Sequence, residues 1–282
     1  MSGYYKSLNS IEDISNVSNE CFQSLYWLSK TEFVDLYFKL KDMDPTYRIK
    51  ELLVYLNYLK QYPTFKELTK MTGHSSSTLQ KFLKRSVEMI CIIFEQEPYK
   101  FEDRLKAKPL LLKGKLVYAI VDASIYKIES IPDPEVEKLY FSNKHGFHGI
   151  KFEFCVDTEG NIVWANGYYD GAIHDIDISQ KSNLVNQKLE PNERVLGGLD
   201  YASEDFEHFF LTVTKDISPS EKTDEEIYMD MILKGKRTII ENLFGRQNQG
   251  LSILKQRYRG DVEYFSDILK SIFCISGKIK LK

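Results

Sequence analysis

The pattern of apolar and polar positions predicts a helical first part of the chain and a strand-containing second part. Residues 116–124, LVYAIVDAS, are apolar on both faces, which is typical of a strand in the middle of a sheet. Further along, apolar and polar side chains alternate over residues 151–156, a turn follows at 157–161, and residues 162–166 return as a second strand. This second pattern predicts a β-hairpin.

Apolar residues at helical spacing predict helices in both parts of the chain. One helix is expected after Thr31, another over residues 47–59, and a late one around residues 239–247. After the strand at 116–124 we expect the hairpin, a short helix, a second short strand that ends near Asp200, and the late helix. The chain opens with a polar segment, rich in Ser and Asn up to about Asn19, which predicts poor order over residues 1–30, and residues 97–115 have the Lys and Pro content of a linker.

The segment PTFKELTKMTGHSSSTLQKFLKR, residues 63–85, predicts two short helices joined by a tight turn. Thr64 and the acid three residues later form a capping-box pattern, and Gly73 allows the chain to turn sharply. Ser75 or Ser76 can then cap the second helix. This is the spacing of a helix-turn-helix.

The charge of this segment favours DNA as its ligand. Residues 60–85 contain six Lys and Arg but one acid, and the second helix begins with small hydrogen-bonding residues, as contacts in a major groove require. An ordinary helical hairpin with a solvated polar face remains the alternative. The candidate DNA contacts here are Ser76, Gln80, Lys81, Lys84 and Arg85.

The formal net charge of −3 hides an uneven distribution along the chain. Residues 109–233 carry 11 basic and 23 acidic side chains, whereas residues 234–282 carry 11 basic and 4 acidic ones. An acidic metal centre flanked by basic segments fits an enzyme that cuts a polyanion, although chance variation among loops remains open. The four Cys form no CxxC pair, and no apolar run approaches a membrane span, so we expect a soluble, intracellular protein without a membrane partner.

Three carboxylates are candidates for a metal centre. Asp122 and Asp200 each end a short apolar run that resembles a strand, and Glu241 lies beside the apolar stripe of the late helix. A lone Asp at a strand end is more often a cap. Three such acids could instead converge on two Mg²⁺ or Mn²⁺ ions, the arrangement used for two-metal hydrolysis of phosphodiesters.

Residues 140–175, YFSNKHGFHGIKFEFCVDTEGNIVWANGYYDGAIHD, resemble the signature block of the Harbinger-type DDE transposases and the nucleases derived from them. The sequence ENLFGR that starts at Glu241 resembles the end of the family's catalytic motif. The resemblance implies an α/β, ribonuclease-H-like catalytic domain with a mixed central sheet, preceded by a small all-α helix-turn-helix domain. It also implies that Asp122, Asp200 and Glu241 are the catalytic, metal-binding residues.

Two departures from the family pattern concern the acids. Ala123 stands where the family usually has Gly, and Tyr201-Ala202-Ser203 replaces a Gly-aromatic pair, which leaves Asp205 as the alternative to Asp200. Asp175 is expected to cap a helix rather than bind metal. Further candidate contacts to DNA phosphates lie in the signature block (Lys144, His145, His148, Lys151) and in a basic tract around the late helix (Arg237, Arg246, Lys255, Arg257, Arg259).

Together these features predict a poorly ordered segment at 1–30, a helical DNA-binding domain at 31–96, a linker at 97–115 and a nuclease domain at 116–282. The expected activity is metal-dependent cleavage of DNA to leave a 3′-hydroxyl, which the resemblance extends to strand transfer with transposon ends and target DNA. A homodimer and a separate DNA-binding partner protein are further expectations from the resemblance. The location would be nuclear in a eukaryote and cytoplasmic in a bacterium. The alternatives are a domesticated or inactive DNA- or protein-binding relative, and a ribonuclease-H-type enzyme acting on RNA.

Overall fold

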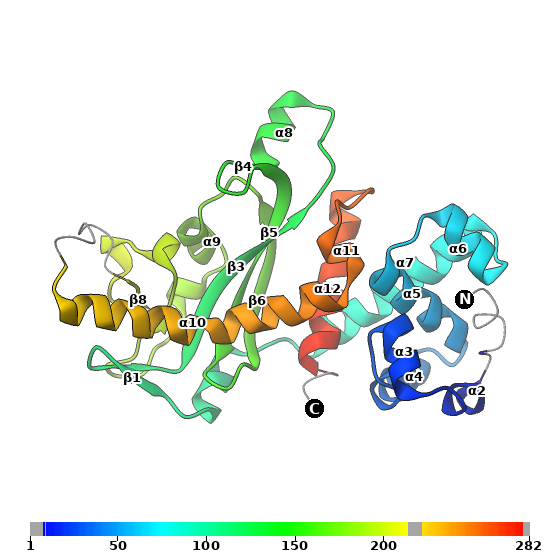
Figure 1. Ribbon diagram of the computed structural model, residues 1–282, viewed down its shortest axis with the longest axis horizontal. Helices are drawn as coiled ribbons and strands as arrows, with labels where there is room; N and C mark the ends of the chain where they lie inside the picture. The colour runs from blue at the N-terminus through cyan, green and yellow to red at the C-terminus, as the bar shows by residue number, and fades with distance from the viewer. Residues whose placement is uncertain (1–7, 9, 214–221, 279–282) are drawn as a thin grey trace. The chain divides into compact units, whose positions relative to one another are not determined.

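The computed structural model describes residue 8, residues 10–213 and residues 222–278. The chain divides into two compact units (Figure 1). The first, here called the helical unit, comprises residues 1–98 and 247–282. The second, the sheet unit, comprises residues 99–246. None of the helices in the described ranges combines the length and apolar character needed to cross a membrane.

Helices from both ends of the sequence form the helical unit. The predicted helices after Thr31 and over 47–59 are present as α4 and α5, and α5 is buried along most of its length. The helices of this unit are α2 (Ile11–Ser15), α3 (Asn19–Tyr26), α4 (Lys30–Met43), α5 (Ile49–Gln61), α6 (Phe65–Thr72), α7 (Ser76–Gln96), α11 (Ser252–Lys255) and α12 (Val262–Lys278).

The segment 63–85 has the local structure that its capping signals predict. Thr64 and Glu67 form a reciprocal capping box at the start of α6, and Gly73 ends this helix in the left-handed conformation with φ of 75°. Of the two candidate caps for the next helix, Ser75 is the one used, since its side chain accepts a hydrogen bond from the backbone of Thr78. The second helix, α7, continues to Gln96, well beyond the predicted motif.

Residues 247–282 group with the N-terminal helices, so the compact units do not follow the predicted boundaries. The reason is the apolar face of α12, where Phe265, Ile268 and Ile272 are buried. Within the same unit, the hydroxyls of Tyr55 and Ser271 share a hydrogen bond. Helix α12 therefore completes the core around α5 and α7.

Two segments have more structure than the sequence predicts. Part of the segment 1–30 forms α2 and α3, which bury Ile14, Phe22 and Tyr26; residues 1–7 and 9 lie outside the described residues. The expected linker at 97–115 contains η1 (Phe101–Lys106) and the strands β1 (Leu110–Leu112) and β2, which begins at Lys115. Arg104 is buried there and donates two hydrogen bonds to Glu193, so this segment belongs to the sheet unit.

A mixed sheet, as expected, forms the centre of the sheet unit. Its strands lie in the order β6-β5-β3-β7-β8, and β4 pairs with the first residues of β5. β3 pairs antiparallel with β5, as does β6, whereas β3 with β7 and β7 with β8 are parallel. The bounds are β2 (Lys115–Val117), β3 (Ala119–Lys127), β4 (Phe141–Ser142), β5 (Phe147–Asp157), β6 (Ile162–Asp170), β7 (Val195–Leu196) and β8 (Phe210–Leu211).

The remaining elements of the sheet unit are helical. The predicted hairpin is β5 with β6, the helix after it is α9, and the late helix is the much longer α10. The elements are α8 (Pro134–Tyr140), α9 (Asp175–Lys181), η2 (Leu184–Asn186), η3 (Leu199–Tyr201), η4 (Glu204–Phe206) and α10 (Asp224–Gly250). Residues 247–250 of α10 fall in the helical unit.

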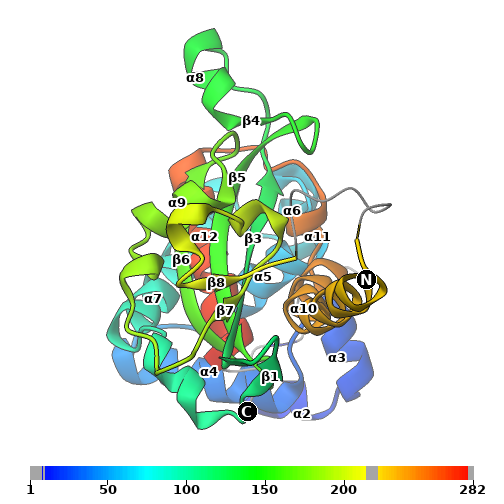
Figure 2. The same ribbon diagram turned by 90° about the vertical axis from the view of Figure 1, so that its left-hand side faces the viewer.

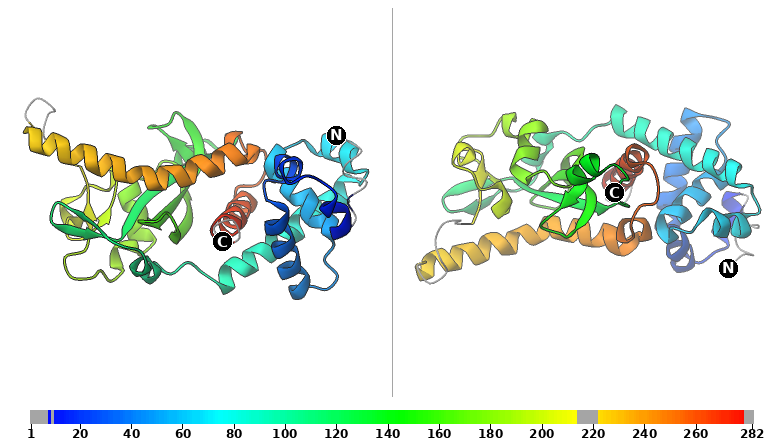
Figure 3. Two further views of the ribbon diagram at one scale, coloured as in Figure 1. Left: turned by 60° about the horizontal axis from the view of Figure 1, so that its bottom comes forward. Right: turned by 90° about the horizontal axis from the view of Figure 1, so that it is seen from above.

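The two faces of the sheet are covered by different helices (Figure 2). Along β5, Lys151 and Glu153 point to one face and bond to residues of α9. Phe154 points to the other face, where its ring lies 5.5 Å from that of Phe244 in α10. Figure 3 shows the sheet-unit part of α10, coloured yellow to orange, running along this second face.

Candidate active site

Asp122 lies on the face of the sheet that α10 covers. In the antiparallel register Asp122 is directly opposite Phe154, and opposed residues of paired strands point to the same face. The sequence predicted that Asp122 ends its strand, but β3 continues to Lys127 because β5 pairs with it along its whole length. Asp122 therefore lies in the middle of a paired strand, with β5 beside it.

Burial is the main influence on the Asp122 carboxylate. It raises the pKa of Asp122 to about 6, against the opposing charge of Arg237 and with a further increase from the charge of Asp175. Oδ2 accepts a hydrogen bond of 2.9 Å from Nη2 of Arg237, and Oδ1 accepts one of 3.1 Å from the backbone N–H of Ala123. The site thus contains a largely desolvated acid with one cationic partner.

Asp200 follows the strand parallel to β3. The predicted strand around Asp200 ends early, at Leu196, and Asp200 lies in η3 just beyond Gly197 and Gly198. Its Oδ2 accepts a hydrogen bond of 2.6 Å from Nζ of Lys144. Both side chains of this ion pair are about half exposed, so the pair is more open to water than that of Asp122.

The two aspartates share one electrostatic neighbourhood. Burial raises the pKa of Asp200, but the Lys144 hydrogen bond and the charges of Lys144, Lys151 and Arg237 outweigh burial and leave the pKa below its ordinary value. Burial lowers the pKa of Lys144, but Asp200, Asp175 and Asp122 raise it above its ordinary value. Arg237 therefore acts on both aspartates, and so does Lys144. The alternative acid, Asp205, is exposed in η4.

Glu241 lies on α10, one helical turn beyond Arg237, and its side chain is exposed. Side chains four residues apart on a helix have Cβ atoms about 5–6 Å apart, so Glu241 and Arg237 start from the same side of α10. Within the described ranges, no group of three or more Asp, Glu, His and Cys residues is arranged to hold a metal ion. The convergence of Asp122, Asp200 and Glu241 on metal therefore stays a prediction.

Comparison with protein families decides what kind of domain this is. Residues 121–276 match the family model described as DDE superfamily endonuclease, and the matched range includes Asp122, Asp200 and Glu241. The chain belongs to this family. No curated protein and no solved structure matches the chain.

In this member of the DDE superfamily endonuclease family, Arg237 has a partner that the sequence did not reveal. The basic tract suggested only that Arg237 follows the DNA backbone, whereas its guanidinium bonds to Asp122. A Cβ atom on Gly198 would lie 3.1 Å from the guanidinium carbon, so the glycine makes room for it. The available signal was the spacing of four residues between Arg237 and Glu241. It places both side chains on one side of the helix and so puts Arg237 beside a candidate acid.

Lys151 and Asp175 form a third ion pair, which is buried in the sheet unit. Nζ of Lys151 lies 2.8 Å from Oδ1 of Asp175 and also donates to the backbone carbonyl of Ile173 at 2.7 Å. The expectation that Asp175 caps a helix is wrong: the N-cap of α9 is His174, and Asp175 is the first helical residue. Lys151, a candidate phosphate contact, is instead buried inside the unit.

Glu153 was not singled out by the sequence, yet it is completely buried in the sheet unit. Its carboxylate accepts hydrogen bonds from the hydroxyls of Ser179 and Ser182 and from Nε1 of Trp164. Burial raises the pKa of Glu153 to about 7, although these three donors act in the opposite direction. Glu153 thus joins β5 to α9 and β6.

The predicted DNA contacts differ in how available they are. Ser76, Gln80, Lys81 and Lys84 are exposed on α7. Arg85 is less available for DNA, because it forms ion pairs with Asp44 and Glu51 inside the helical unit. In the endonuclease domain Arg246 is exposed, Lys144 is paired with Asp200, and Nε2 of His148 lies 3.1 Å from Oε1 of Glu137.

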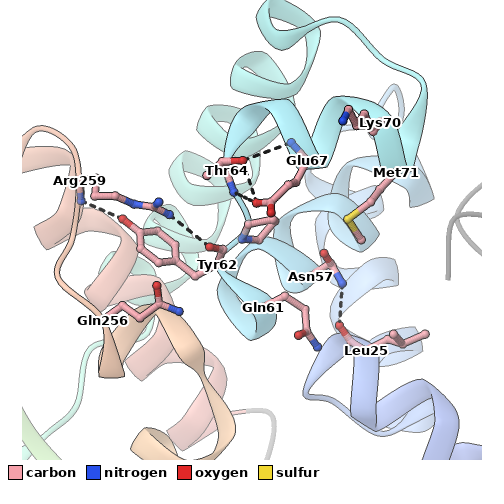
Figure 4. Close-up of a pocket in the computed structure, with 11 residues that line it drawn as sticks. Leu25, Asn57, Gln61, Tyr62, Thr64, Glu67, Lys70, Met71, Gln256 and Arg259 are labelled. Carbon is pink, nitrogen blue, oxygen red and sulfur yellow. Dashed lines mark hydrogen bonds between the residues drawn. The ribbon is translucent and has the colours of Figure 1, made fainter.

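A pocket of about 550 Å³ lies in the helical unit (Figure 4). Arg259 donates from its backbone to the Tyr62 hydroxyl at 2.8 Å and from its side chain to the Tyr62 carbonyl at 3.3 Å. Thr64 and Glu67, which also line the pocket, are bonded to each other in the capping box. Asp122, Asp200 and Glu241 are not among its lining residues, so this pocket is not the candidate active site.

Proposed function

We propose that this protein is a metal-dependent DNA endonuclease in which Asp122, Asp200 and Glu241 are the catalytic carboxylates. The observation that carries the proposal is that Asp122 lies on β3 and Asp200 lies just beyond the adjacent parallel strand β7, within one cluster of charges, in a chain of the DDE superfamily endonucleases. Glu241 is included as the third carboxylate because the sequence that it starts resembles the family motif and because it lies one helical turn from Arg237.

The sheet supports the finer assignment to a ribonuclease-H-like fold of the Harbinger type. Three antiparallel strands, β6, β5 and β3, are followed across the sheet by the parallel strands β7 and β8. The order strand, hairpin, helix, strand, helix agrees with the resemblance described above. Transposon ends as substrate and strand transfer as a second step belong to this finer proposal, as do a homodimer and a separate DNA-binding partner.

The residues present fit a divalent cation. Carboxylate oxygens are the ligands that Mg²⁺ and Mn²⁺ prefer, and Asp122 supplies one that is largely desolvated. Asp122 and Asp200 would hold the ions together with Glu241. When bound, two such ions supply an activated water and stabilise the leaving oxygen of the phosphodiester. Strand β3 fixes the position of Asp122. Helix α10 covers this face of the sheet and keeps water away from the carboxylate.

DNA binding by the helical unit is part of the same proposal. Ser76, Gln80, Lys81 and Lys84 project from the first turns of α7, where a recognition helix carries its base and phosphate contacts. Duplex DNA is therefore favoured over RNA as the substrate.

One observation favours a second candidate, a relative that binds DNA without cutting it. Asp122 and Asp200 are each bound by a basic side chain, and the described residues contain no group of three acids arranged for metal. Such internal neutralisation would suit a protein that has no metal to bind. A cleavage assay distinguishes the two candidates.

The test is to incubate the purified protein with supercoiled plasmid, with and without Mg²⁺ or Mn²⁺. We expect nicking or linearisation that needs the metal and that Asp122→Asn or Glu241→Gln abolishes, because each variant removes a charged ligand. Glu225→Gln is the matched control, since Glu225 is an exposed acid on the same helix as Glu241. Full cleavage by either site variant, or in excess chelator, would contradict the proposal.

A further inference from the structure

Asp122 and Asp200 are neutralised by side chains of their own domain. The Arg237 pair has side chains about one-fifth exposed, and the Lys144 pair is about half exposed. A third pair, Lys151 with Asp175, is buried beside them. These three pairs therefore match three carboxylates with three cations, without any metal.

A divalent cation at Asp122 and Asp200 would upset this balance. Two like charges that compete for one carboxylate in a partly buried site repel each other strongly. Metal can thus bind well only if Arg237 and Lys144 move away from the carboxylates. Lys151 has no such need, because its partner Asp175 and the carbonyl of Ile173 are not predicted metal ligands.

Arg237 has hydrogen-bonding capacity that Asp122 does not use. One Nη2–H bonds to the carboxylate, while Nε is buried and has no partner among the described residues. A guanidinium presents five donors in a planar fork that matches phosphate, often through two parallel hydrogen bonds. The fork is therefore better matched to a phosphate than to the single carboxylate oxygen it now binds.

We infer that Arg237 and Lys144 are exchangeable counter-ions: they hold Asp122 and Asp200 in the metal-free site and bind phosphates of DNA when a divalent cation takes over these carboxylates. The inference rests on the proposed function, because it needs both the metal and the DNA. The cation displaces Arg237 and Lys144 from the carboxylates, and the DNA phosphates bind the same two side chains. Each ligand should therefore strengthen binding of the other.

The experiment measures Mn²⁺ binding rather than cleavage. Free Mn²⁺ is followed by electron paramagnetic resonance during titration of the full chain, with and without a DNA duplex, and Asp122→Asn supplies the background. In the wild type we expect the duplex to tighten Mn²⁺ binding on the order of tenfold, within the usual range of such couplings. Without DNA, Arg237→Gln should bind Mn²⁺ more tightly than the wild type, and the duplex should then have a much smaller effect.

Lys144→Gln provides an independent variant that should fold, because the Lys144 side chain is more than half exposed. It should change Mn²⁺ affinity in the same direction as Arg237→Gln. Lys234→Gln is the matched control, an exposed lysine on α10 that should leave Mn²⁺ affinity and its response to DNA unchanged.

The outcomes separate the inference from the proposed function. If the wild type binds no more Mn²⁺ than Asp122→Asn does, the metal site itself fails. If the wild type does bind more, but Arg237→Gln and Lys144→Gln match it with and without DNA, the counter-ion exchange alone is overturned.

Discussion

At the scale of single residues, Glu153 shows how a buried acid can be stabilised by hydrogen bonds from several elements of a fold. A carboxylate that is fully out of water needs hydrogen-bond donors, and Ser179, Ser182 and Trp164 supply them from two other elements. Its backbone is paired with that of Ala123, next to Asp122 on β3. Protonation of Glu153 therefore affects the stability of the layer that supports the candidate site.

The stability of the fold is expected to depend on pH through Glu153. The pKa is about 7 in the folded protein against an ordinary value of 4.5, so the folded state binds the proton more tightly. The resulting stabilisation is fully present below pH 4.5 and is lost as pH rises through 7. The shift corresponds to about 3 kcal/mol in the free energy of unfolding.

Urea unfolding of the wild type and of Glu153→Gln at a series of pH values checks this. The difference between the two proteins removes the titration of other groups. We expect the wild type to lose stability relative to Glu153→Gln between pH 5 and 8. A difference that does not change over this range would mean that Glu153 titrates as in the unfolded chain.

At the scale of secondary structure elements, α7 combines two kinds of basic residue that look alike in the sequence. Lys81 and Lys84 are exposed, whereas Arg85 lies on the side that faces Asp44 and Glu51. Glu51 is almost completely buried, so the guanidinium compensates a charge that water does not reach. The lysines are therefore available for DNA, and the arginine is needed for the fold.

Replacing Lys81 and Lys84 by Ala should reduce the dependence of DNA affinity on salt concentration. Each lost phosphate contact lowers the slope of log affinity against log salt by about 0.9, so the double variant should lose about 2. DNA affinity measured over a range of salt concentrations gives this slope. Lys39→Ala, on α4, is the control that should leave it unchanged.

Arg85→Ala should behave differently from the two lysine changes. Its main effect should be a loss of about 1–3 kcal/mol in the free energy of unfolding, because Glu51 loses a charged partner. Should the salt slope fall with Arg85→Ala while stability is unchanged, the arginine would be a DNA contact after all.

Local sequence signals predicted the caps and turns of these elements well. Features that depend on contacts between residues far apart in the sequence could not be predicted. The capping box of Thr64 and Glu67 and the turn at 157–161 follow from residues a few positions apart. The bond from Arg237 to Asp122 joins residues 115 positions apart, and no local pattern encodes it. The same holds for strand ends: β3 continues past Asp122 because β5 lies beside it, and β7 stops before a glycine pair.

At the scale of the whole molecule, the chain leaves the helical unit at Pro98 and returns to it at Gln247. The family match at 121–276 therefore includes the whole of α11 and most of α12, which belong to the core of the helical unit. Part of what the family model recognises serves the N-terminal helices rather than the sheet.

Phe265→Ala tests this membership. Phe265 is fully buried in α12, so its truncation should cost about 3–5 kcal/mol and weaken the helical unit. Amide hydrogen exchange should show lost protection in α5 and α7, with β3 and β5 little changed. Val163→Ala, at a buried position of β6, is the comparison, and its losses should lie in the sheet. Equal losses in both places after Phe265→Ala would mean that the units do not unfold separately.

The divided helical unit has a consequence for synthesis on the ribosome. Domains generally begin to fold as they emerge, N-terminal parts first. Here the apolar surfaces of α5 and α7 emerge early, but α12, which covers part of them, is translated only after the entire sheet unit. The nascent chain must keep these surfaces from aggregating until residues 262–278 arrive, so a stop codon before α12 would leave a sheet unit attached to helices whose apolar surface stays uncovered.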